Sequence, residues 1–463
     1  MDRIRLGFVP SHRYPFDEDW AVEMRRRTID SLSAVPGVEI VVPSVGLIHN
    51  GLVRDDTGAR ASIDLFAQRG VQGVIIGAMT FGDEVSAVSI AEGLDVPVLV
   101  FGTKEGPLTS GGGRRSDAFS GTLAITSGLY RRKIPYLFAG IVWPEEPSLA
   151  HAVWIFARAC AAVDAFYGAR IGMVGLRPER SEACTFSEAA LIQHFRQRVV
   201  QIPESEVVAA ANAWPEDDHR LIATFEEMRR EADCSACGQA ALSRMARLEL
   251  VLQRCFQERD LSAMAMACGN GAQARPDDPP AGICACHTLR RLADRGMIVA
   301  CEIDVLGALT MLTQYRASLE DAVPFFIDWA VQHPEMGDVF LAWHCGNVST
   351  APAAGEPANV SPSGAGDGAQ DACASPLEPG AVTLSRLAEY DGTFKMLITS
   401  GEIIPSGDRP GGTSAWVRVG DLSRLYRVLA EQGFAHHASL IHGDAADALE
   451  AFCRFTGIEA VRV

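Results

Sequence analysis

The sequence predicts an α/β protein in which two parallel-sheet units are followed by a β-rich C-terminal part. Short apolar runs rich in valine and isoleucine, each bounded by glycine or proline, alternate with helical patterns in the N-terminal third. The same alternation restarts at "ARIGMVGLR" (169–177), and after about residue 320 strand-like segments follow one another through glycine-containing turns. The first two patterns are typical of parallel sheets, and the third is typical of an antiparallel sheet or barrel.

The first unit contains four predicted strands, at 4–9, 37–43, 73–77 and 96–101. Helical patterns such as "DEDWAVEMRRRTIDSLSAV" and "GDEVSAVSIAEGL" lie between them, which predicts a parallel sheet covered on both faces. The long helical segment "LAHAVWIFARACAAVDAFYG" closes this unit. We therefore place the first domain at residues 1–165.

The second unit is also predicted to be α/β, over residues 166–320. Its strands are 169–177, 196–203 and 296–304, and helical segments extend through residue 264. The third domain, 321–463, is predicted to be β-rich, and its last segment reads helix, strand, helix, strand. Alanine, glycine, proline and serine dominate residues 351–380, which predicts a flexible surface insertion because such a stretch buries little apolar surface.

Composition narrows the class of protein. Hydrophobic residues make up 48 % of the 463 residues and charged residues 21 %, as in ordinary globular proteins. The net charge of −17 argues against nucleic-acid binding, which needs a basic face. The N-terminus lacks the order of regions found in a signal peptide, and no apolar run approaches the length needed to span a bilayer. Twelve cysteines fit reduced thiols better than a disulfide framework, so we expect a cytoplasmic protein without a membrane partner.

Two carboxylates in "VACEIDVLGALTML" (299–312) mark a candidate site. Glu302 and Asp304 follow an apolar run, where a carboxylate is costly unless it is paired, so the stretch predicts either an ion pair or a site. Asp304 precedes a helical pattern and is predicted to cap that helix.

Possible partners lie downstream. Asp328 follows an apolar run, His344 lies inside a strand-like segment, and His436 and His437 precede another apolar segment. Carboxylate oxygens and imidazole nitrogens bind Mn²⁺, Co²⁺ or Zn²⁺ when they converge on one point. Spacing alone favours ordinary ion pairs, helix caps and core histidines over such a site.

Several strings occur in an order that resembles the L-fucose isomerase-like family, which is more distantly related to the L-arabinose isomerases. They are "GFVPSHRYPFD", "AMTFGDE", "ACEIDVLGALTML", "PFFIDWAV", "FLAWHCGN", "GAVTLSRLAEYDGTFKMLITSGEI" and "AHHASLIHGD". Members of that family have two N-terminal Rossmann-like α/β domains and a C-terminal domain that contains a β-barrel. The resemblance covers nearly the whole chain and implies the same fold here.

The resemblance also implies a metal site. Active sites of the family hold a divalent metal, usually manganese, between two acidic residues and a histidine. By that resemblance Glu302 and Asp328 match the two acids, and His437, with His436 as the alternative, matches the histidine. His344 resembles an additional metal-facing histidine of the arabinose isomerases, and we take it as a site residue.

Arg13, in "PSHRYPFD", lies after the first strand, where α/β folds place ligands. In the family the corresponding loop can approach the sugar, sometimes from a neighbouring subunit. We therefore weigh substrate binding by Arg13 against a surface ion pair.

The predicted function is a metal-dependent aldose–ketose isomerase that acts on a free sugar through an ene-diol. Glu302 and Asp328 would hold Mn²⁺ and exchange protons, and the family pattern implies a homo-oligomer, a trimer or hexamer. Two alternatives remain open. One is another metal-enolate enzyme, performing an aldol-type or redox step on a sugar or sugar acid, and the other is a non-catalytic sugar-binding protein.

Overall fold

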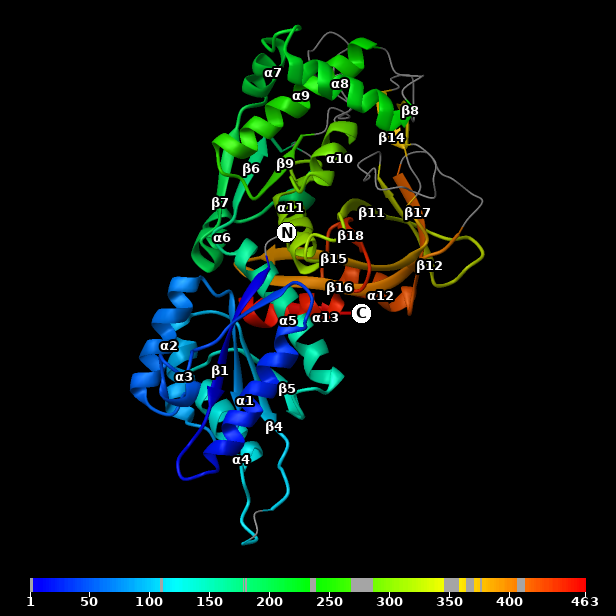
Figure 1. The fold of residues 1–463 in the computed structure, drawn as a ribbon. Coiled ribbons are helices and arrows are strands. Elements are labelled where there is room, and N and C mark those ends of the chain that lie inside the picture. The colour runs from blue at the N-terminus through cyan, green and yellow to red at the C-terminus, as the bar shows by residue number, and fades with distance from the viewer. Residues whose placement is uncertain are drawn as a thin grey trace. The chain divides into compact units, whose positions relative to one another are not determined.

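The structure is a computed structural model of the 463-residue chain. It describes residues 3–108, 111–177, 179, 181–233, 239–267, 286–344, 358–363, 370–374, 377–405 and 413–463. The chain divides into two compact units (Figure 1). Unit 1 comprises Met1–Asp164 with Glu450–Gly457, and unit 2 comprises Ala165–Leu449 with Ile458–Val463.

Unit 1 is built on a five-stranded parallel sheet in the order β2-β1-β3-β4-β5. Its strands are β1 (Ile4–Ser11), β2 (Val38–Val41), β3 (Gly73–Ala78), β4 (Val98–Thr103) and β5 (Tyr136–Val142). Every residue of β3 and β4 is buried, as expected for central strands covered on both faces. The predicted parallel sheet is confirmed, and β5 is an edge strand that the sequence patterns did not predict.

Aspartate caps begin three of the helices of unit 1. The side chains of Asp17, Asp55 and Asp83 accept hydrogen bonds from backbone N–H groups in the first turn that follows each of them. The helices of this unit are α1 (Glu18–Ser33), η1 (His49–Gly51), α2 (Asp56–Arg69), α3 (Glu84–Leu94), α4 (Ala118–Arg131) and α5 (Pro147–Phe166). These caps fix where each helix leaves the carboxyl edge of the sheet.

Contrary to the sequence analysis, one helix of the described residues, α5, is long and apolar enough to cross a membrane. Its most apolar window is 61 % buried within the protein, as in the core helix of a folded domain. The length and composition of this helix are therefore weak evidence for a membrane span.

Unit 2 opens with a four-stranded parallel sheet in the order β10-β9-β6-β7. Its strands are β6 (Arg170–Val174), β7 (Arg198–Ile202), β9 (Ala263–Met266) and β10 (Val299–Ala300). The helices are η2 (Glu182–Cys184), α6 (Glu188–Phe195), α7 (Glu204–Asn212), α8 (His219–Glu231), α9 (Gln239–Glu258), α10 (Cys286–Asp294) and α11 (Val305–Ala317). The predicted second parallel-sheet α/β region is thereby confirmed.

The C-terminal part of unit 2 is a closed antiparallel barrel of six strands. The order β15-β18-β11-β12-β17-β16 closes through the pairing of β15 with β16, and β19 adds to β16 in parallel. The elements are β11 (Phe325–Gln332), β12 (Val339–His344), β15 (Gly380–Tyr390), β16 (Thr393–Ile403), β17 (Thr413–Val419), α12 (Leu422–Glu431), β18 (His437–His442) and β19 (Glu459–Arg462). Helix α13 (Ala446–Thr456) begins in unit 2, and its residues from Glu450 onward belong to unit 1. The predicted β-barrel is confirmed.

Helix α11 connects the parallel sheet to the barrel. It is buried on almost every side, and it contacts β9 and β10 of the sheet as well as β15 and β18 of the barrel. Gln314 donates to the backbone oxygen of Thr383, and Ser439 donates to the Gln314 side chain at 2.5 Å. The C-terminal end of α11 is therefore fixed relative to the barrel strands that follow it in the chain.

The stretch 351–380 lies partly outside the described residues. Two strands are described within it, β13 (Ala358–Ser363) and β14 (Gln370–Ala374), which pair with each other, and β13 also pairs with β8 (Ala232–Asp233). The flexibility of this insertion stays a prediction.

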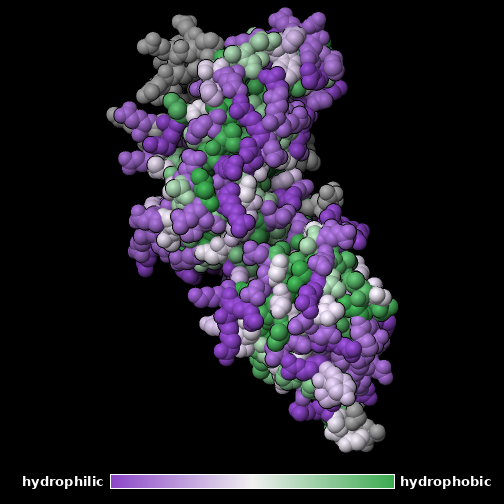
Figure 2. Space-filling model, turned by 90° about the vertical axis from the view of Figure 1, so that its left-hand side faces the viewer, coloured by the Kyte–Doolittle hydropathy of each residue, from purple (hydrophilic) through white to green (hydrophobic). Residues whose placement is uncertain are grey.

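One face of the molecule is mainly polar (Figure 2). Figure 2 shows one face, on which hydrophilic side chains predominate and apolar side chains gather in smaller patches. Such a surface agrees with the ordinary globular composition.

Substituting Gly121 should destabilise unit 1. A Cβ atom at Gly121 on α4 would lie 1.6 Å from the backbone oxygen of Phe81, so Gly121→Ala forces α4 away from the loop after β3. We expect a loss of about 1–3 kcal/mol of unfolding free energy, measured by urea denaturation followed by circular dichroism. Ser127→Ala, at an exposed position of the same helix, is the control and should change stability little. Equal stability of the two variants would contradict the close packing of α4.

Candidate active site

The turn that carries Glu302 departs from the predicted strand. The sequence predicted a strand over 296–304, but β10 ends at Ala300, and Glu302 and Ile303 both have φ of +60°. Two successive non-glycine residues in the left-handed region cost about 1–2 kcal/mol each, so the surrounding structure must hold this turn in place. The turn ends at Asp304, whose side chain accepts from the backbone N–H of Gly307 at 2.7 Å. The predicted cap of α11 by Asp304 is confirmed.

Two barrel strands bring the second carboxylate and the histidine together. Asp328 on β11 lies directly opposite His437 on β18, so their side chains share one face of the sheet. Nε2 of His437 lies 3.8 Å from Oδ1 of Asp328 and 3.2 Å from Oε2 of Glu302. Glu302, Asp328 and His437, the three residues that the family resemblance implies as metal ligands, therefore converge at one place.

The other ring nitrogen of His437 faces a buried ion pair. Nδ1 lies 2.9 Å from Oδ2 of Asp304, and Arg386 on β15 donates to both oxygens of the same carboxylate. The side chains of His437, Asp304 and Arg386 are 0 %, 1 % and 2 % exposed. One nitrogen of His437 is thus occupied, and the other points to Glu302 and Asp328.

These contacts shift the pKa values in the site. Burial alone would raise the pKa of Asp304, but the charge of Arg386 and the hydrogen bond with His437 outweigh it and hold that pKa well below its ordinary value. Burial alone would lower the pKa of His437, whereas the hydrogen bond to Asp304 and the contacts with Cys184 and Glu302 raise it to about 11. Burial raises the pKa of Asp328.

The other two predicted histidines also lie here. Nε2 of His344, at the end of β12, is 4.0 Å from Oε1 of Glu302, and its ring packs on Phe326, which also contacts His437. His436 is exposed, and its ring centroid is 4.0 Å from that of His437. Both histidines border the place where the two carboxylates and His437 meet.

The donor set fits a divalent cation. Nε2 of His437 and Oδ1 of Asp328 are buried, and neither has a hydrogen-bond partner within the described part of the chain. Ligand atoms of Glu302, His436 and His437 also lie within 4.8 Å of one another. A metal between these atoms would satisfy buried polar groups that are otherwise costly.

A second group of possible ligands is less suitable. Cys184, Asp304 and His437 lie within 4.8 Å of one another, with Sγ of Cys184 at 3.8 Å from Nδ1 of His437. Both oxygens of Asp304 are already held by Arg386, whose positive charge would repel a cation at this point. The side of His437 that faces Glu302 and Asp328 is therefore the better metal site.

Comparisons with known proteins place the chain in a family. A model described as the fucose/sulfoquinovose isomerase N-terminal domain matches residues 7–167, and one described as the L-fucose isomerase C-terminal domain matches residues 343–462. Together they span more than half of the chain. The chain belongs to the L-fucose isomerase-like family.

Curated relatives extend the match. The chain is 23 % identical to the sulfoquinovose isomerase of Priestia aryabhattai over 468 residues, which cover 99 % of each protein. It is 24 % identical to that of Alkalicoccus urumqiensis, over 84 % of the chain and 86 % of the relative, and 25 % identical to that of Clostridium sp. (strain MSTE9), over 84 % and 85 %. Like the L-fucose isomerase-like family to which it belongs, this protein is an aldose–ketose isomerase, which leaves the alternative of a non-catalytic sugar-binding protein without support.

Arg13 lies in unit 1, at the carboxyl end of β1. Its guanidinium group pairs with Glu84 and lies 4.8 Å from the ring centroid of Phe81. The ion pair considered in the sequence analysis is therefore present, and a role in substrate binding stays a prediction.

The sequence analysis missed two residues of this site. Cys184 gave no signal, because it lies in a short η2 turn far from the other site residues in the chain. Arg386 gave one. It falls at two-residue spacing with Val382, Leu384 and Ala388, which are all buried, and an arginine on an apolar strand face needs an acidic partner. The L-fucose isomerase-like motif "GAVTLSRLAEYDG" thus contains a site residue that its alternation could have revealed.

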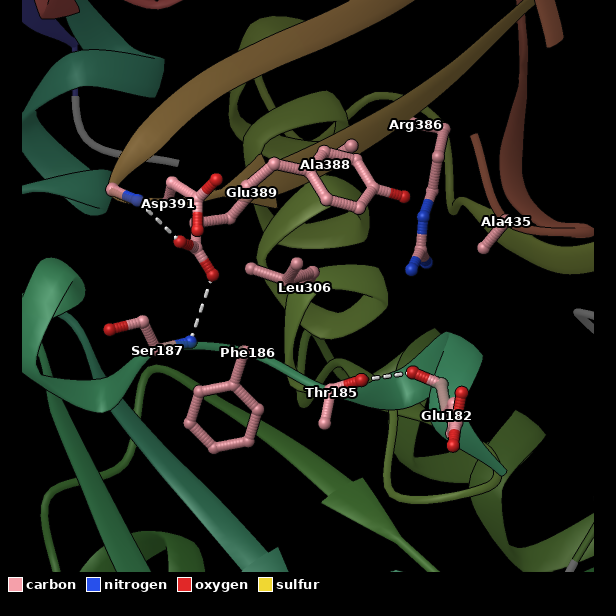
Figure 3. Close-up of a pocket in the computed structure, with 12 residues that line it drawn as sticks. Glu182, Thr185, Phe186, Ser187, Leu306, Arg386, Ala388, Glu389, Asp391 and Ala435 are labelled. Carbon is pink, nitrogen blue, oxygen red and sulfur yellow. Dashed lines mark hydrogen bonds between the residues drawn. The ribbon is translucent and has the colours of Figure 1, made fainter. Parts of the chain in front are cut away.

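A pocket of about 450 Å³ borders Arg386 (Figure 3). Arg386 and Glu389 of β15 line it together with Leu306 of α11 and Ala435, the residue before His436. Backbone N–H groups of Ser187 and Gly392 both donate to the Glu389 carboxylate, which fixes one wall. Arg386 lines this pocket although its side chain is only 2 % exposed.

Substituting Cys184 should leave metal binding intact. If the metal lies at Nε2 of His437, Cys184→Ser should change Mn²⁺ affinity by no more than about twofold, because a side chain beside Nδ1 is not a ligand of that metal. Calorimetric titration measures this affinity. Co²⁺ provides a second readout, since a cysteine ligand adds a sulfur-to-cobalt charge-transfer band to the absorption spectrum. Such a band in the parent, lost in Cys184→Ser, would move the metal to the Cys184 side.

Proposed function

We propose that this isomerase is metal-dependent and that Glu302, Asp328 and His437 form its metal site. The observation that carries the proposal is the convergence of both carboxylates on the buried Nε2 of His437, at 3.2 and 3.8 Å. Manganese is the expected ion, since carboxylate and imidazole ligands suit it and the family resemblance implies it. When bound, the cation stabilises negative charge that develops on the sugar oxygens.

The two carboxylates are suited to proton transfer. Interconversion of an aldose and a ketose moves a proton between adjacent carbons through an ene-diol, and a carboxylate beside each carbon can accept and return it. The Glu302 side chain is 42 % exposed and that of Asp328 25 %, so both can reach a bound sugar. Burial raises the pKa of Asp328.

We propose that the sugar is sulfoquinovose, an aldohexose whose C6 carries a sulfonate. Three relatives that cover most of the chain bear that name, and the N-terminal domain model names it beside fucose. His344 and His436, which border the metal ligands, would contact the sugar hydroxyl groups. Arg13 would bind the sulfonate, because a guanidinium group offers paired donors to such an oxyanion.

We further propose a cytoplasmic homo-oligomer, a trimer or hexamer, with domains at 1–165, 166–320 and 321–463. Five of the described cysteines are buried thiols, which suits a reducing compartment. Phe119 and Tyr130 on α4 and Phe138 on β5 are 57 %, 79 % and 53 % exposed, and apolar groups of this size on one helix and an edge strand suit a contact between subunits.

Isotope exchange tests the chemistry. In D₂O with Mn²⁺, the parent should exchange the hydrogen at C2 of its sugar with solvent, because an ene-diol loses and regains that proton. Glu302→Gln and Asp328→Asn should each slow exchange by about 100-fold or more, since general acid–base groups contribute this much. Nuclear magnetic resonance of sulfoquinovose, L-fucose and a set of pentoses measures the exchange.

The matched control for these variants is Glu335→Gln, an exposed acid-to-amide change on the turn after β11. It should exchange like the parent. Parent protein stripped by a chelator should lose exchange and regain it with Mn²⁺. Exchange that survives chelation, or that persists in both folded site variants, would contradict the proposed mechanism.

Arg13→Gln tests the sulfonate. Loss of a charged hydrogen bond worth about 1.5–3 kcal/mol should raise KM for sulfoquinovose by roughly 10- to 100-fold and KM for an unsulfonated sugar much less. Arg26→Gln, at an exposed arginine of α1 paired with Glu23 and Asp30, is the control. Equal effects of Arg13→Gln on both sugars in steady-state assays would exclude this role.

A further inference from the structure

We propose that Asp304 and Arg386 are positioning residues that fix the ring orientation and tautomer of His437, so that its Nε2 lone pair points to the metal. The inference rests on the proposed function, because it assumes that His437 is a metal ligand. It extends that function to two residues that touch neither the metal nor the sugar.

The carboxylate of Asp304 is held from three directions. Its Oδ1 accepts from the backbone N–H of Gly307 at 2.7 Å and from Nη2 of Arg386 at 3.2 Å. Its Oδ2 accepts from Nη1 of Arg386 and faces Nδ1 of His437 at 2.9 Å. Helix α11 and strand β15 therefore set the plane of the carboxylate without any contribution from His437.

This arrangement determines which ring nitrogen carries a proton. Arg386 only donates hydrogen bonds, so the carboxylate between it and His437 is ionised and only accepts. Nδ1 of His437 must then donate to Oδ2. In the neutral ring this leaves the lone pair on Nε2, directed at the place where Glu302 and Asp328 meet.

Arg386 contributes through its charge. Asp304 is 1 % exposed, and an ionised carboxylate at that depth requires a compensating charge. The guanidinium group also makes the Nδ1 side of His437 unfavourable for a cation. The pair thus specifies both the nitrogen that binds the metal and the side from which the metal is held.

A helix cap alone does not require this arrangement. Capping of α11 uses only Oδ1 of Asp304, and asparagine caps a helix as well as aspartate does. Asp304→Asn therefore keeps the cap and the volume but replaces the acceptor that faces Nδ1 with an amide donor. Nδ1 must then accept, the proton moves to Nε2, and Nε2 is lost as a ligand.

The first experiment measures how fast metal leaves the loaded protein. The dissociation rate is chosen because it does not depend on the proton that the metal displaces when it binds. Mn²⁺ should leave Asp304→Asn about 10- to 100-fold faster than it leaves the parent, the usual effect of losing such a partner on metal retention. The absorption spectrum of the Co²⁺ protein should change as one nitrogen ligand is lost.

Asp421→Asn is the matched control. Asp421 caps α12 through a hydrogen bond from the backbone N–H of Arg424 at 2.8 Å, so the same change is made at a cap outside the metal site. It should retain the parental dissociation rate and Co²⁺ spectrum. The inference is overturned if Asp421→Asn and Asp304→Asn change the dissociation rate and the Co²⁺ spectrum equally. It is also overturned if Asp304→Asn changes neither.

A second variant uses the pocket beside Arg386 and keeps the test valid if Asp304→Asn does not fold. Arg386→Ala should release Mn²⁺ faster, and guanidinium ion at millimolar, non-denaturing concentration should enter through the pocket and slow the release again. Arg386→Lys should retain more metal than Arg386→Ala. A structural role alone would show no rescue by guanidinium, and that result would overturn the role of Arg386.

Failure of this inference can be told apart from failure of the proposed function. A parent protein that holds no Mn²⁺ or Co²⁺ would overturn both, and this is read from the parent alone. A different result is a parent that holds metal and exchanges sugar protons while Asp304→Asn and Arg386→Ala release metal at the parental rate. That result would overturn only the positioning role.

Discussion

The buried carboxylate of Asp304 is the interaction on which the geometry of the site depends. It caps α11, pairs with Arg386 of β15 and accepts from His437 of β18. Removal of either charge of such a pair would leave the other buried without compensation, at a cost of about 3–5 kcal/mol. Three elements that are distant in sequence therefore meet at one group, which faces His437, one of the three proposed metal ligands.

The contacts of Asp304 also explain how the strained turn before α11 is held. Glu302 and Ile303 adopt left-handed conformations that an isolated chain would avoid. The turn is held at one end by the short strand β10 and at the other by the cap that Asp304 provides. A regular strand would alternate its side chains and place Glu302 and Asp304 on the same face. The turn instead sends Asp304 to Nδ1 and Glu302 to Nε2 of the same imidazole ring.

Sequence patterns predicted the architecture, and the family resemblance supplied the proposed metal ligands. Alternating strands and helices predicted both parallel sheets, because these patterns report local periodicity and burial. Glycine-containing turns left an antiparallel sheet and a barrel open, and the family resemblance implied the barrel. Glu302, Asp328 and His437 were found through motifs of the family, and the structure brings them together. Spacing alone could not have selected them, since nothing in a one-dimensional pattern states that β11 and β18 pair with Asp328 opposite His437.

The residues behind the ligands were harder to predict for a physical reason. Asp304 reads as a helix cap, and that reading is correct but incomplete, because one carboxylate can cap a helix with one oxygen and orient a histidine with the other. Arg386 reads as an isolated charge within a strand until its partner is known. A ligand can be recognised by its own chemistry, whereas a positioning residue is defined only by what it touches. The sequence therefore predicts where a metal could bind more readily than how the protein keeps His437 in the orientation that binds it.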